Sequence, residues 1–181
     1  MTVIDTGNQL ITAKNLSIGN ILQDSYDKLI MTTGSWAVIP KFEGFEVDNI
    51  ILCMNYAHAQ TVIQKAKRAS KIAVIGAGYI GNELVKRSTL FGKNVTFIDS
   101  EKRILNRYLD EEFTNIIEAE LNKRGINLAL NEMVKKFEGD NGKVTKVVTN
   151  EQVYDADLVI LCIGSRPNTD LFKGRGNMLP N

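Results

Sequence analysis

The sequence predicts an α/β fold in which helices flank a parallel sheet and a three-stranded antiparallel meander follows. Three observations predict it. A glycine-rich string at residues 76–81 stands between a continuous apolar run and a helical pattern of apolar residues. Apolar runs and helical patterns then alternate, which is typical of parallel βαβ units. Beyond residue 130 the helical period ends, and short runs around a Gly-Asp-Asn-Gly turn indicate antiparallel strands.

The composition excludes several classes of protein. The 181 residues, 44% hydrophobic and 24% charged, are typical of a folded globular protein with one large or two small domains. The 22 basic and 21 acidic residues leave a net charge of +1, which argues against a nucleic-acid binder. No apolar run approaches the roughly 20 residues that span a bilayer, and no signal peptide is evident, so we expect no membrane partner. Two cysteines form neither a zinc cluster nor a disulfide framework, so a cytoplasmic location is expected.

The first part of the chain is predicted to form short extended segments separated by turns. Residues 3–4 and 10–13 are short strands with a turn between them. Residues 26–31 (YDKLIM) are apolar enough for a buried strand. Residues 36–40 are extended, because a residue that precedes proline avoids the helical region. Residues 49–53 are a further candidate for a buried strand.

The alternating part begins with a helix that Asn55 can cap and that runs to about Ala69, with one apolar stripe at helical spacing. Residues 71–75 follow as a continuous apolar strand, the kind that is buried on both faces of a parallel sheet. The next helix comes after the glycine string and ends at Gly92. Residues 94–98 form the second strand, which Asp99 closes.

A further helix is predicted to begin at residues 110–112, whose acidic side chains suit the helix dipole, and to end at Gly125. Residues 126–130 form the third strand. The meander strands then cover residues 133–138, 143–149 and 152–154, and residues 157–163 are one more continuous apolar strand.

The glycine string has the context that gives it chemical meaning: a strand before it, a helix after it, and an acid at the end of the next strand. Gly76 permits the tight turn, Gly78 lets the backbone approach a pyrophosphate, and Gly81 lets the helix pack on the strand. Asp99, 18 residues past Gly81, would accept hydrogen bonds from a ribose and repel a 2′-phosphate. The pattern therefore predicts a Rossmann-like NAD-binding domain that favours NAD over NADP.

Other reactive side chains have simpler interpretations. Lys102 and Arg103 could weaken the preference for NAD, and are equally well explained as solvated loop cations. His58, the single histidine, is expected to be a surface or packed residue. Cys53 and Cys162 lie in apolar runs and are expected to be buried small hydrophobes and not reactive thiols.

Four motifs in order carry a resemblance to a known family: KIAVIGAGYIGNELV, VTFIDS, RYLDEEF and DLVILCIGSRPNT. They resemble the pyridine-nucleotide-disulfide oxidoreductases, closest to the branch of flavoprotein NADH oxidases, NADH peroxidases and coenzyme A-disulfide reductases. The upstream segment YDKLIMTTGSWAVIP is also similar to that branch. The resemblance covers nearly the whole chain.

The resemblance implies a modular layout. Residues 1–55 correspond to the end of a first FAD-domain segment, residues 56–163 to the NAD(H)-binding domain, and residues 164–181 to the start of the return to the FAD domain. The family's FAD-binding glycine turn, redox cysteine motif and interface domain have no counterpart in this sequence. We therefore expect a central fragment of a longer flavoprotein, with FAD bound by the full-length parent.

The resemblance also implies which residues contact cofactors, with no catalytic side chain and no metal ligand in this chain. The three glycines of the turn match the NAD pyrophosphate site, and Asp99 matches the ribose-binding acid. Tyr108 matches a tyrosine beside the adenine. The positions at the nicotinamide and flavin end are Tyr79, Ile80, Glu83 and Gly164.

The function implied is the NAD(H)-binding portion of a flavoprotein NADH oxidase, an enzyme that passes hydride from NADH to FAD and on to dioxygen. In the parent, FAD and dioxygen or peroxide would be further partners, and the parent is expected to be a homo-oligomer. The isolated chain is expected to be inactive. Two alternatives stay open: a stand-alone NADH-binding module without catalysis, or a fragment of an NADH peroxidase, coenzyme A-disulfide reductase, ferredoxin reductase or nitrite reductase.

Overall fold

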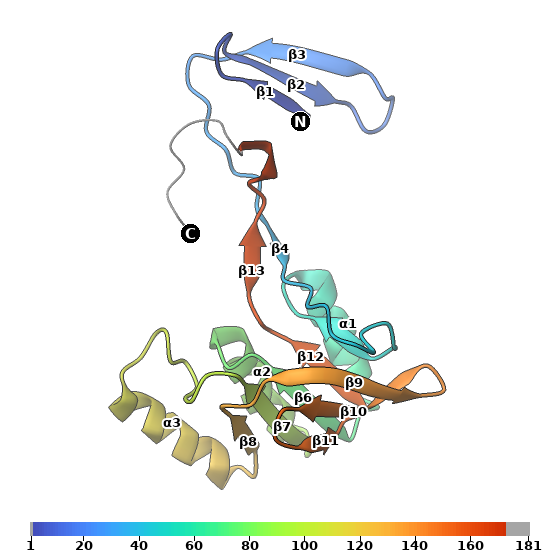
Figure 1. The fold of residues 1–181 in the computed structure, drawn as a ribbon, viewed down its shortest axis with the longest axis vertical. Helices are drawn as coiled ribbons and strands as arrows, with labels where there is room; N and C mark the ends of the chain where they lie inside the picture. Colours follow the sequence, from blue (N-terminus) through green and yellow to red (C-terminus); the bar gives the residue numbers. More distant parts are fainter. Residues whose placement is uncertain (1, 173–181) are drawn as a thin grey trace. The chain divides into compact units, whose positions relative to one another are not determined.

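The computed structural model describes residues 2–172 (Figure 1). The chain divides into two compact units, one of Met1–Trp36 with Arg166–Asn181 and one of Ala37–Ser165. The sequence predicted cofactor-domain boundaries at 55/56 and 163/164, whereas these compact units divide at 36/37 and 165/166. Those boundaries concern cofactor domains and stay a prediction.

The first unit contains a small antiparallel sheet in the order β1-β2-β3. Its strands are β1 (Val3–Asp5), β2 (Leu10–Lys14) and β3 (Ile21–Ser25), and a short 3₁₀ helix, η1 (Asp170–Phe172), also belongs to this unit. The predictions at residues 3–4 and 10–13 are confirmed. The predicted buried strand at 26–31 is wrong, since the third strand lies earlier and Ile30 is largely exposed. An apolar run forms a strand only where a neighbouring strand completes its backbone hydrogen bonds. Here β3 occupies the edge of β2, so β2 offers no free edge to residues 26–31.

The second unit is built on a five-stranded sheet in the order β5-β12-β6-β7-β8, and every neighbouring pair in it is parallel. Its strands are β5 (Ile50–Leu52), β6 (Lys71–Ile75), β7 (Asn94–Asp99), β8 (Asn127–Leu130) and β12 (Leu158–Leu161). Four of them lie within runs that the sequence predicted as strands, and β7 extends its predicted run by one residue, to Asp99. The continuous apolar runs are explained by burial on both faces.

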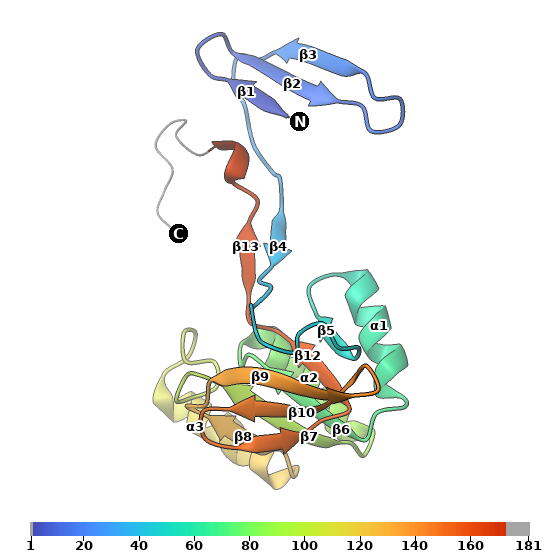
Figure 2. The same ribbon diagram turned by 45° about the vertical axis from the view of Figure 1, so that its right-hand side comes forward.

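Helices cover one face of this sheet and the meander covers the other (Figures 1 and 2). The helices are α1 (Tyr56–Ala66), α2 (Tyr79–Leu90) and α3 (Glu111–Lys123), and the meander strands are β9 (Val134–Asp140), β10 (Lys143–Thr149) and β11 (Val153–Asp155). Alternate strand residues serve the two faces: Val74 and Phe97 pack under the helices, while Ala73 and Ile98 pack against the meander.

Local sequence signals explain where these elements begin and end. The Asn55 side chain accepts the His58 N–H at 2.9 Å, which caps α1 as predicted, although the helix ends at Ala66 and not near Ala69. Asn141 and Gly142 both have positive φ, which forms the tight turn between β9 and β10.

Two short strands, β4 (Ser35–Ala37) and β13 (Ser165–Pro167), pair with each other. No helix among the described residues is long and apolar enough to cross a membrane.

Candidate cofactor site

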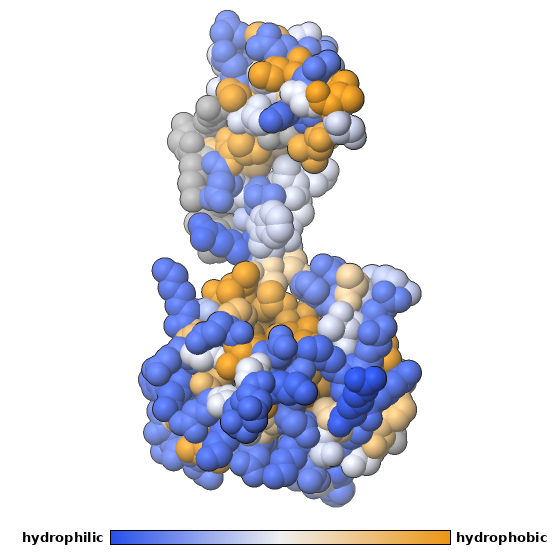
Figure 3. Space-filling model, turned by 90° about the vertical axis from the view of Figure 1, so that its right-hand side faces the viewer, coloured by the Kyte–Doolittle hydropathy of each residue, from blue (hydrophilic) through white to orange (hydrophobic). Residues whose placement is uncertain are grey.

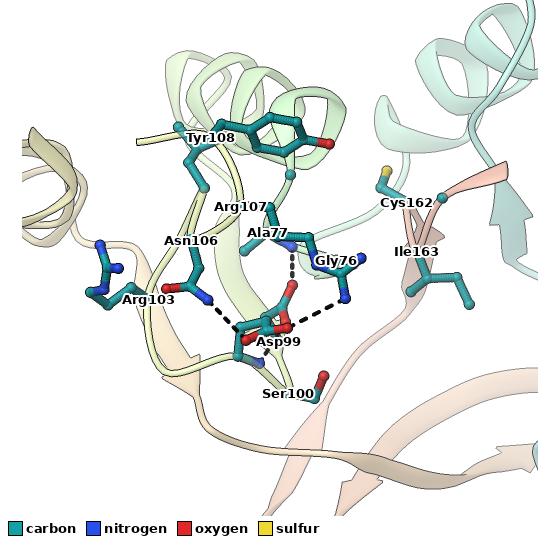
Figure 4. Close-up of a pocket in the computed structure, with 14 residues that line it drawn as sticks. Gly76, Ala77, Asp99, Ser100, Arg103, Asn106, Arg107, Tyr108, Cys162 and Ile163 are labelled. Atoms are coloured by element: carbon teal, nitrogen blue, oxygen red, sulfur yellow. Dashed lines mark hydrogen bonds and ion pairs between the residues drawn. The ribbon is translucent and has the colours of Figure 1, made fainter. Parts of the chain in front are cut away.

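A cavity of about 240 Å³ opens at the carboxyl edge of the parallel sheet, where β6 and β7 end side by side. Its wall is formed by the turn between β6 and α2, by the loop after β7, and by residues 162–164 after β12. Figure 4 shows these segments around one space. The strand order reverses between β12 and β6, and ligands of open parallel sheets bind at such a point.

The turn from β6 into α2 needs glycine at two positions because the backbone is crowded there. Gly76 has a φ of +103°, and a Cβ at this position would lie 2.5 Å from the Cys162 carbonyl oxygen. A Cβ at Gly81 would overlap the Gly76 carbonyl oxygen and come within 3.0 Å of the Phe97 ring. The turn is therefore packed backbone against backbone on the start of α2 and on the segment after β12, while β7 contributes the Phe97 side chain.

Gly78 differs from these two glycines because it borders open space. A Cβ at Gly78 would meet no atom within 4 Å, and the residue lines the cavity. Gly78 is also the N-cap of α2, and no side chain caps this helix end. The first N–H groups of α2 are thus available to an anionic ligand, which the helix dipole also favours.

Asp99 ends β7 and lies at the floor of the cavity. Its carboxylate accepts the N–H of Ala77 in the glycine turn and, at 2.7 Å, the N–H of Glu101 in the loop beyond (Figure 4). These two bonds fix the carboxylate before any ligand arrives. Each oxygen of a carboxylate has two acceptor positions, so Asp99 can still accept hydrogen bonds from ligand hydroxyl groups.

The loop after β7 adds side chains that the sequence analysis did not single out. Glu101 lines the cavity and accepts Nδ2 of Asn106 at 3.0 Å and pairs with Arg107 at 3.5 Å. No motif in the sequence indicated these contacts, because they depend on how the loop folds back on itself.

Of the two loop cations discussed from sequence, Arg103 lines the cavity that also contains Asp99, but its side chain is engaged elsewhere. The Nη1 of Arg103 donates to Thr114 Oγ1 of α3 at 3.0 Å, and Figure 4 shows its side chain turned away from Asp99. Lys102 does not line the cavity. The geometry therefore favours their interpretation as structural or solvated cations.

A second cavity, of about 290 Å³, shares Gly78, Tyr108 and residues 162–164 with the first. Tyr79, Ile80 and Gly164, predicted for the nicotinamide and flavin end, all line it. Tyr79 and Tyr108 stand where the two cavities meet, with ring centroids 4.4 Å apart. Seven of the nine predicted cofactor residues thus line these two adjoining cavities: Gly76, Gly78, Tyr79, Ile80, Asp99, Tyr108 and Gly164.

Two of the predicted site residues, Gly81 and Glu83, line neither cavity, and Gly81 instead packs against the Gly76 carbonyl. Glu83 lies on the exposed side of α2, and its carboxylate pairs with Arg87 one helical turn further along α2 at 3.1 Å. The contact of Glu83 with a nicotinamide or a flavin stays a prediction.

The expectation of fully buried cysteines is wrong. Cys53 and Cys162 are both partly exposed and both line the second cavity. Burial nevertheless raises the pKa of Cys162 to about 12, and burial also raises the pKa of Cys53. The thiols are therefore mostly protonated near neutral pH, as expected.

The surface of the second unit also carries apolar side chains. A groove of about 650 Å³ lies between α1 and α2, on the helical side of the sheet and away from the glycine turn. Val38, Ile39 and Ile80 are among the exposed apolar residues. Figure 3 shows apolar residues gathered on one face of this unit within a mostly hydrophilic surface.

Comparison with known proteins places these features in a family. Residues 1–179 match the family described as pyridine nucleotide-disulphide oxidoreductase. The NADH oxidase of Enterococcus faecalis is 51% identical over 179 residues, covering 98% of this chain and 40% of the relative. That of Streptococcus pneumoniae is 37% identical over 193 residues, with 98% and 41% covered. The chain thus spans about 40% of the length of these curated relatives.

Two solved structures have the same fold. The water-forming NADH oxidase from Lactobacillus brevis, bound to NADH, matches with a TM-score of 0.89 at 44% identity. The match covers 99% of this chain and 40% of the oxidase. An engineered, NADPH-bound variant of that enzyme matches with a TM-score of 0.89 at 43% identity over the same shares of the two chains. From its glycine turn, its acid at the end of β7 and these matches along its length, we conclude that the chain belongs to the pyridine nucleotide-disulphide oxidoreductase family.

Proposed function

We propose that this chain is the NADH-binding portion of a flavoprotein NADH oxidase, in which hydride passes from NADH to FAD and on to dioxygen. One observation carries the proposal: Gly78 of the glycine turn borders both the cavity that contains Asp99 and the adjoining cavity that contains Tyr79, Ile80 and Gly164. The relatives named NADH oxidase and the NADH-bound structure support it.

The first task of the chain is to hold the pyrophosphate. The uncapped N–H groups at the start of α2 would donate to its oxygens, and the positive end of the helix dipole would face its charge. The bare Cα of Gly78 leaves room for this close approach. Arg103 and Arg107 also line this cavity.

The second task is to choose between NADH and NADPH. Asp99 would accept the ribose hydroxyl groups, and Asp99 with Glu101 would repel a 2′-phosphate. The engineered NADPH-bound neighbour supports this assignment. Its substitutions include a glycine and, 18 positions on, an aspartate, which is the spacing of Gly81 and Asp99. The spacing of its other substitutions corresponds to Ser100, Glu101 and Asn106, all of which line the cavity.

The third task is to present the nicotinamide end to the flavin. A bound NADH supplies a hydride from its nicotinamide ring, and the flavin carries the electron chemistry. Tyr79, Ile80 and Gly164 would form an apolar wall that orients the ring and excludes water. FAD and dioxygen would be partners of the full-length protein, which would be a homo-oligomer.

A chimera tests the proposal. The 179 matched residues of the Enterococcus faecalis NADH oxidase would be replaced by this chain, and NADH-dependent oxygen uptake would be measured. We expect an active oxidase that prefers NADH over NADPH, whereas the same chimera with Gly78→Val would lose NADH affinity. A chimera that retains FAD, yet is not reduced by NADH, would overturn the proposal. If that chimera failed while the isolated chain still bound NADH, the alternative function, a stand-alone NADH-binding module, would replace the proposed one.

A further inference from the structure

Cys53 and Cys162 are neighbours across two parallel strands. In the ladder between β5 and β12, Leu52 pairs with Leu161, and each of these leucines is followed by a cysteine. The ladder continues into the cysteines, because the Cys53 N–H donates to the Leu161 carbonyl at 3.1 Å. Neighbouring strands lie about 4.8 Å apart, within the roughly 4.4–6.8 Å between Cα atoms that a disulfide requires.

The two side chains also lie on the same face of the sheet. Both cysteines pack against the helix-side core that contains Val62 and Val85. Their proximity has an electrostatic consequence, since the Cys53 thiol contributes to the raised pKa of Cys162. Both thiols therefore occupy one small region between the sheet and the helices.

This region is open to small molecules. Both cysteines line the cavity of about 290 Å³ that also contains Tyr79 and Gly164. The backbone beneath them is held firmly, because the Cys162 N–H donates to the Ile75 carbonyl at 2.7 Å. A fixed pair of thiols beside a cavity differs from two isolated core cysteines, since the pair can react with itself.

We infer that Cys53 and Cys162 form a redox-sensitive thiol pair that a peroxide converts into a cross-strand disulfide at the nicotinamide end of the site. One thiol loses its proton, and its thiolate attacks a peroxide oxygen; the O–O bond breaks, and a sulfenic acid and, with that proton, one water form. Because burial raises the pKa of both thiols, this step accelerates as the pH rises. The second sulfur then attacks the first, an S–S bond forms, and the hydroxyl leaves as a second water. Two thiols are oxidised by two electrons and one peroxide is reduced.

The rate of disulfide formation should depend on whether NADH occupies the proposed site. If the nicotinamide end of NADH fills the cavity, it would separate the thiols from dissolved peroxide. NADH should then slow disulfide formation, and this consequence rests on the proposed function.

Intact-mass analysis of the purified chain with hydrogen peroxide tests the inference. The chain contains two cysteines, so an intramolecular disulfide lowers its mass by about 2 Da, and dithiothreitol restores it. Peptide mapping without reduction should join Cys53 to Cys162. In Cys53→Ser and Cys162→Ser, disulfide-linked dimers should form at least about tenfold more slowly than the internal bond forms in the parent chain. Circular dichroism would verify that the variants remain folded.

Several outcomes would overturn the inference: thiols that persist under peroxide, separate oxidation to sulfinic acids, or dimers as the main product in the parent chain. The NADH arm is independent of these. If the disulfide forms equally fast with saturating NADH, the thiol pair stands and the placement of the nicotinamide end fails.

Discussion

Asp99 links the sheet, the glycine turn and the loop beyond it through one side chain. Its carboxylate accepts backbone N–H groups from Ala77 and Glu101, so it organises the cavity as well as facing a ligand. Substitution at this position should therefore affect both affinity and selectivity.

In calorimetry, the chain is expected to bind NADH more tightly than NADPH. Asp99→Ala should weaken NADH binding by about 1–3 kcal/mol, the scale of hydrogen bonds to a charged group, and narrow the difference between the two nucleotides. Asp140→Ala, in the exposed hairpin between β9 and β10, is the matched control and should bind as the parent does. Equal affinity of the unsubstituted chain for NADH and NADPH would contradict the role of Asp99. It would indicate that Arg107 determines how the 2′-phosphate is received.

Cys162 provides a pH-dependent readout at the residue scale. Because burial raises the pKa of Cys162 to about 12, the thiolate is about one part in ten thousand at pH 8. In Cys53→Ser, alkylation by iodoacetamide should accelerate about tenfold per pH unit between pH 8 and 11. A rate that levels off near pH 9, as for a free cysteine, would show that the thiol is not protected.

At the scale of elements, the junction between β6 and α2 separates packing from binding. A side chain at Gly81 would collide with the turn and with Phe97, whereas one at Gly78 would enter open space. The two positions lie three residues apart, yet substitution of Gly81 should reduce stability and substitution of Gly78 should reduce NADH affinity.

Gly81→Val should lower the free energy of unfolding by about 1–3 kcal/mol because the helix must move off the turn. Gly78→Ala should leave Tm nearly unchanged and weaken NADH binding, because its methyl group occupies the space where the pyrophosphate would approach. Thermal denaturation and calorimetry on both variants measure the two effects. An unchanged Tm for Gly81→Val would mean that α2 does not pack closely on the turn.

The turn between β8 and β9 is held by a buried carboxylate. Glu132 is 7% exposed, and it accepts the hydroxyl groups of Thr149 and Tyr154, each at 2.6 Å. Burial and the hydrogen bond to Glu132 raise the pKa of Tyr154. The Glu132 N–H also donates to the Asp99 carbonyl at 2.9 Å, which ties this turn to the cavity.

Tyr154→Phe removes one donor from this buried carboxylate and should lower the free energy of unfolding by about 1–3 kcal/mol. Tyr26→Phe is the control, because that hydroxyl makes an exposed contact with the Asp5 carbonyl at 3.5 Å. Urea denaturation of both variants gives the comparison. Similar losses in the two would show that Glu132 does not depend on Tyr154.

At the scale of the whole molecule, the chain carries the proposed NADH site but spans about 40% of the length of its curated relatives. Hydride leaves a nicotinamide only for an acceptor held against it. Among the described residues that line the nicotinamide-end cavity, Tyr79 and Ile80 can shape the space but cannot accept a hydride.

The isolated chain is therefore expected to bind NADH without consuming it under air, even when free FAD is added. Oxygen uptake and NADH absorbance would be followed with the purified chain, and free FAD alone would serve as the blank. Turnover well above that blank would mean that the chain builds a flavin site by itself.

Much of the site could be predicted because its main residues lie close together in the sequence. Residues 71–99 contain strand, glycine turn, helix, strand and acid in one continuous stretch, and their order along the chain determines the contact of Asp99 with the turn. The same holds for the Asn55 cap and the turn at Asn141, where a side chain or a positive φ acts within a few residues. The run at residues 26–31 misled because strand formation needs a partner that local hydrophobicity does not reveal.

The sequence by itself therefore determined the parallel order of strands and helices, the glycine turn and the acid opposite it, since these depend on local steric limits and on periodicity. Only the tertiary structure decided which distant residues share a cavity. It turned Arg103 toward α3, placed Glu101 and Asn106 in the cavity wall, and brought Cys53 beside Cys162. These contacts join positions whose neighbours are set by strand register and loop folding, and no short-range pattern encodes either.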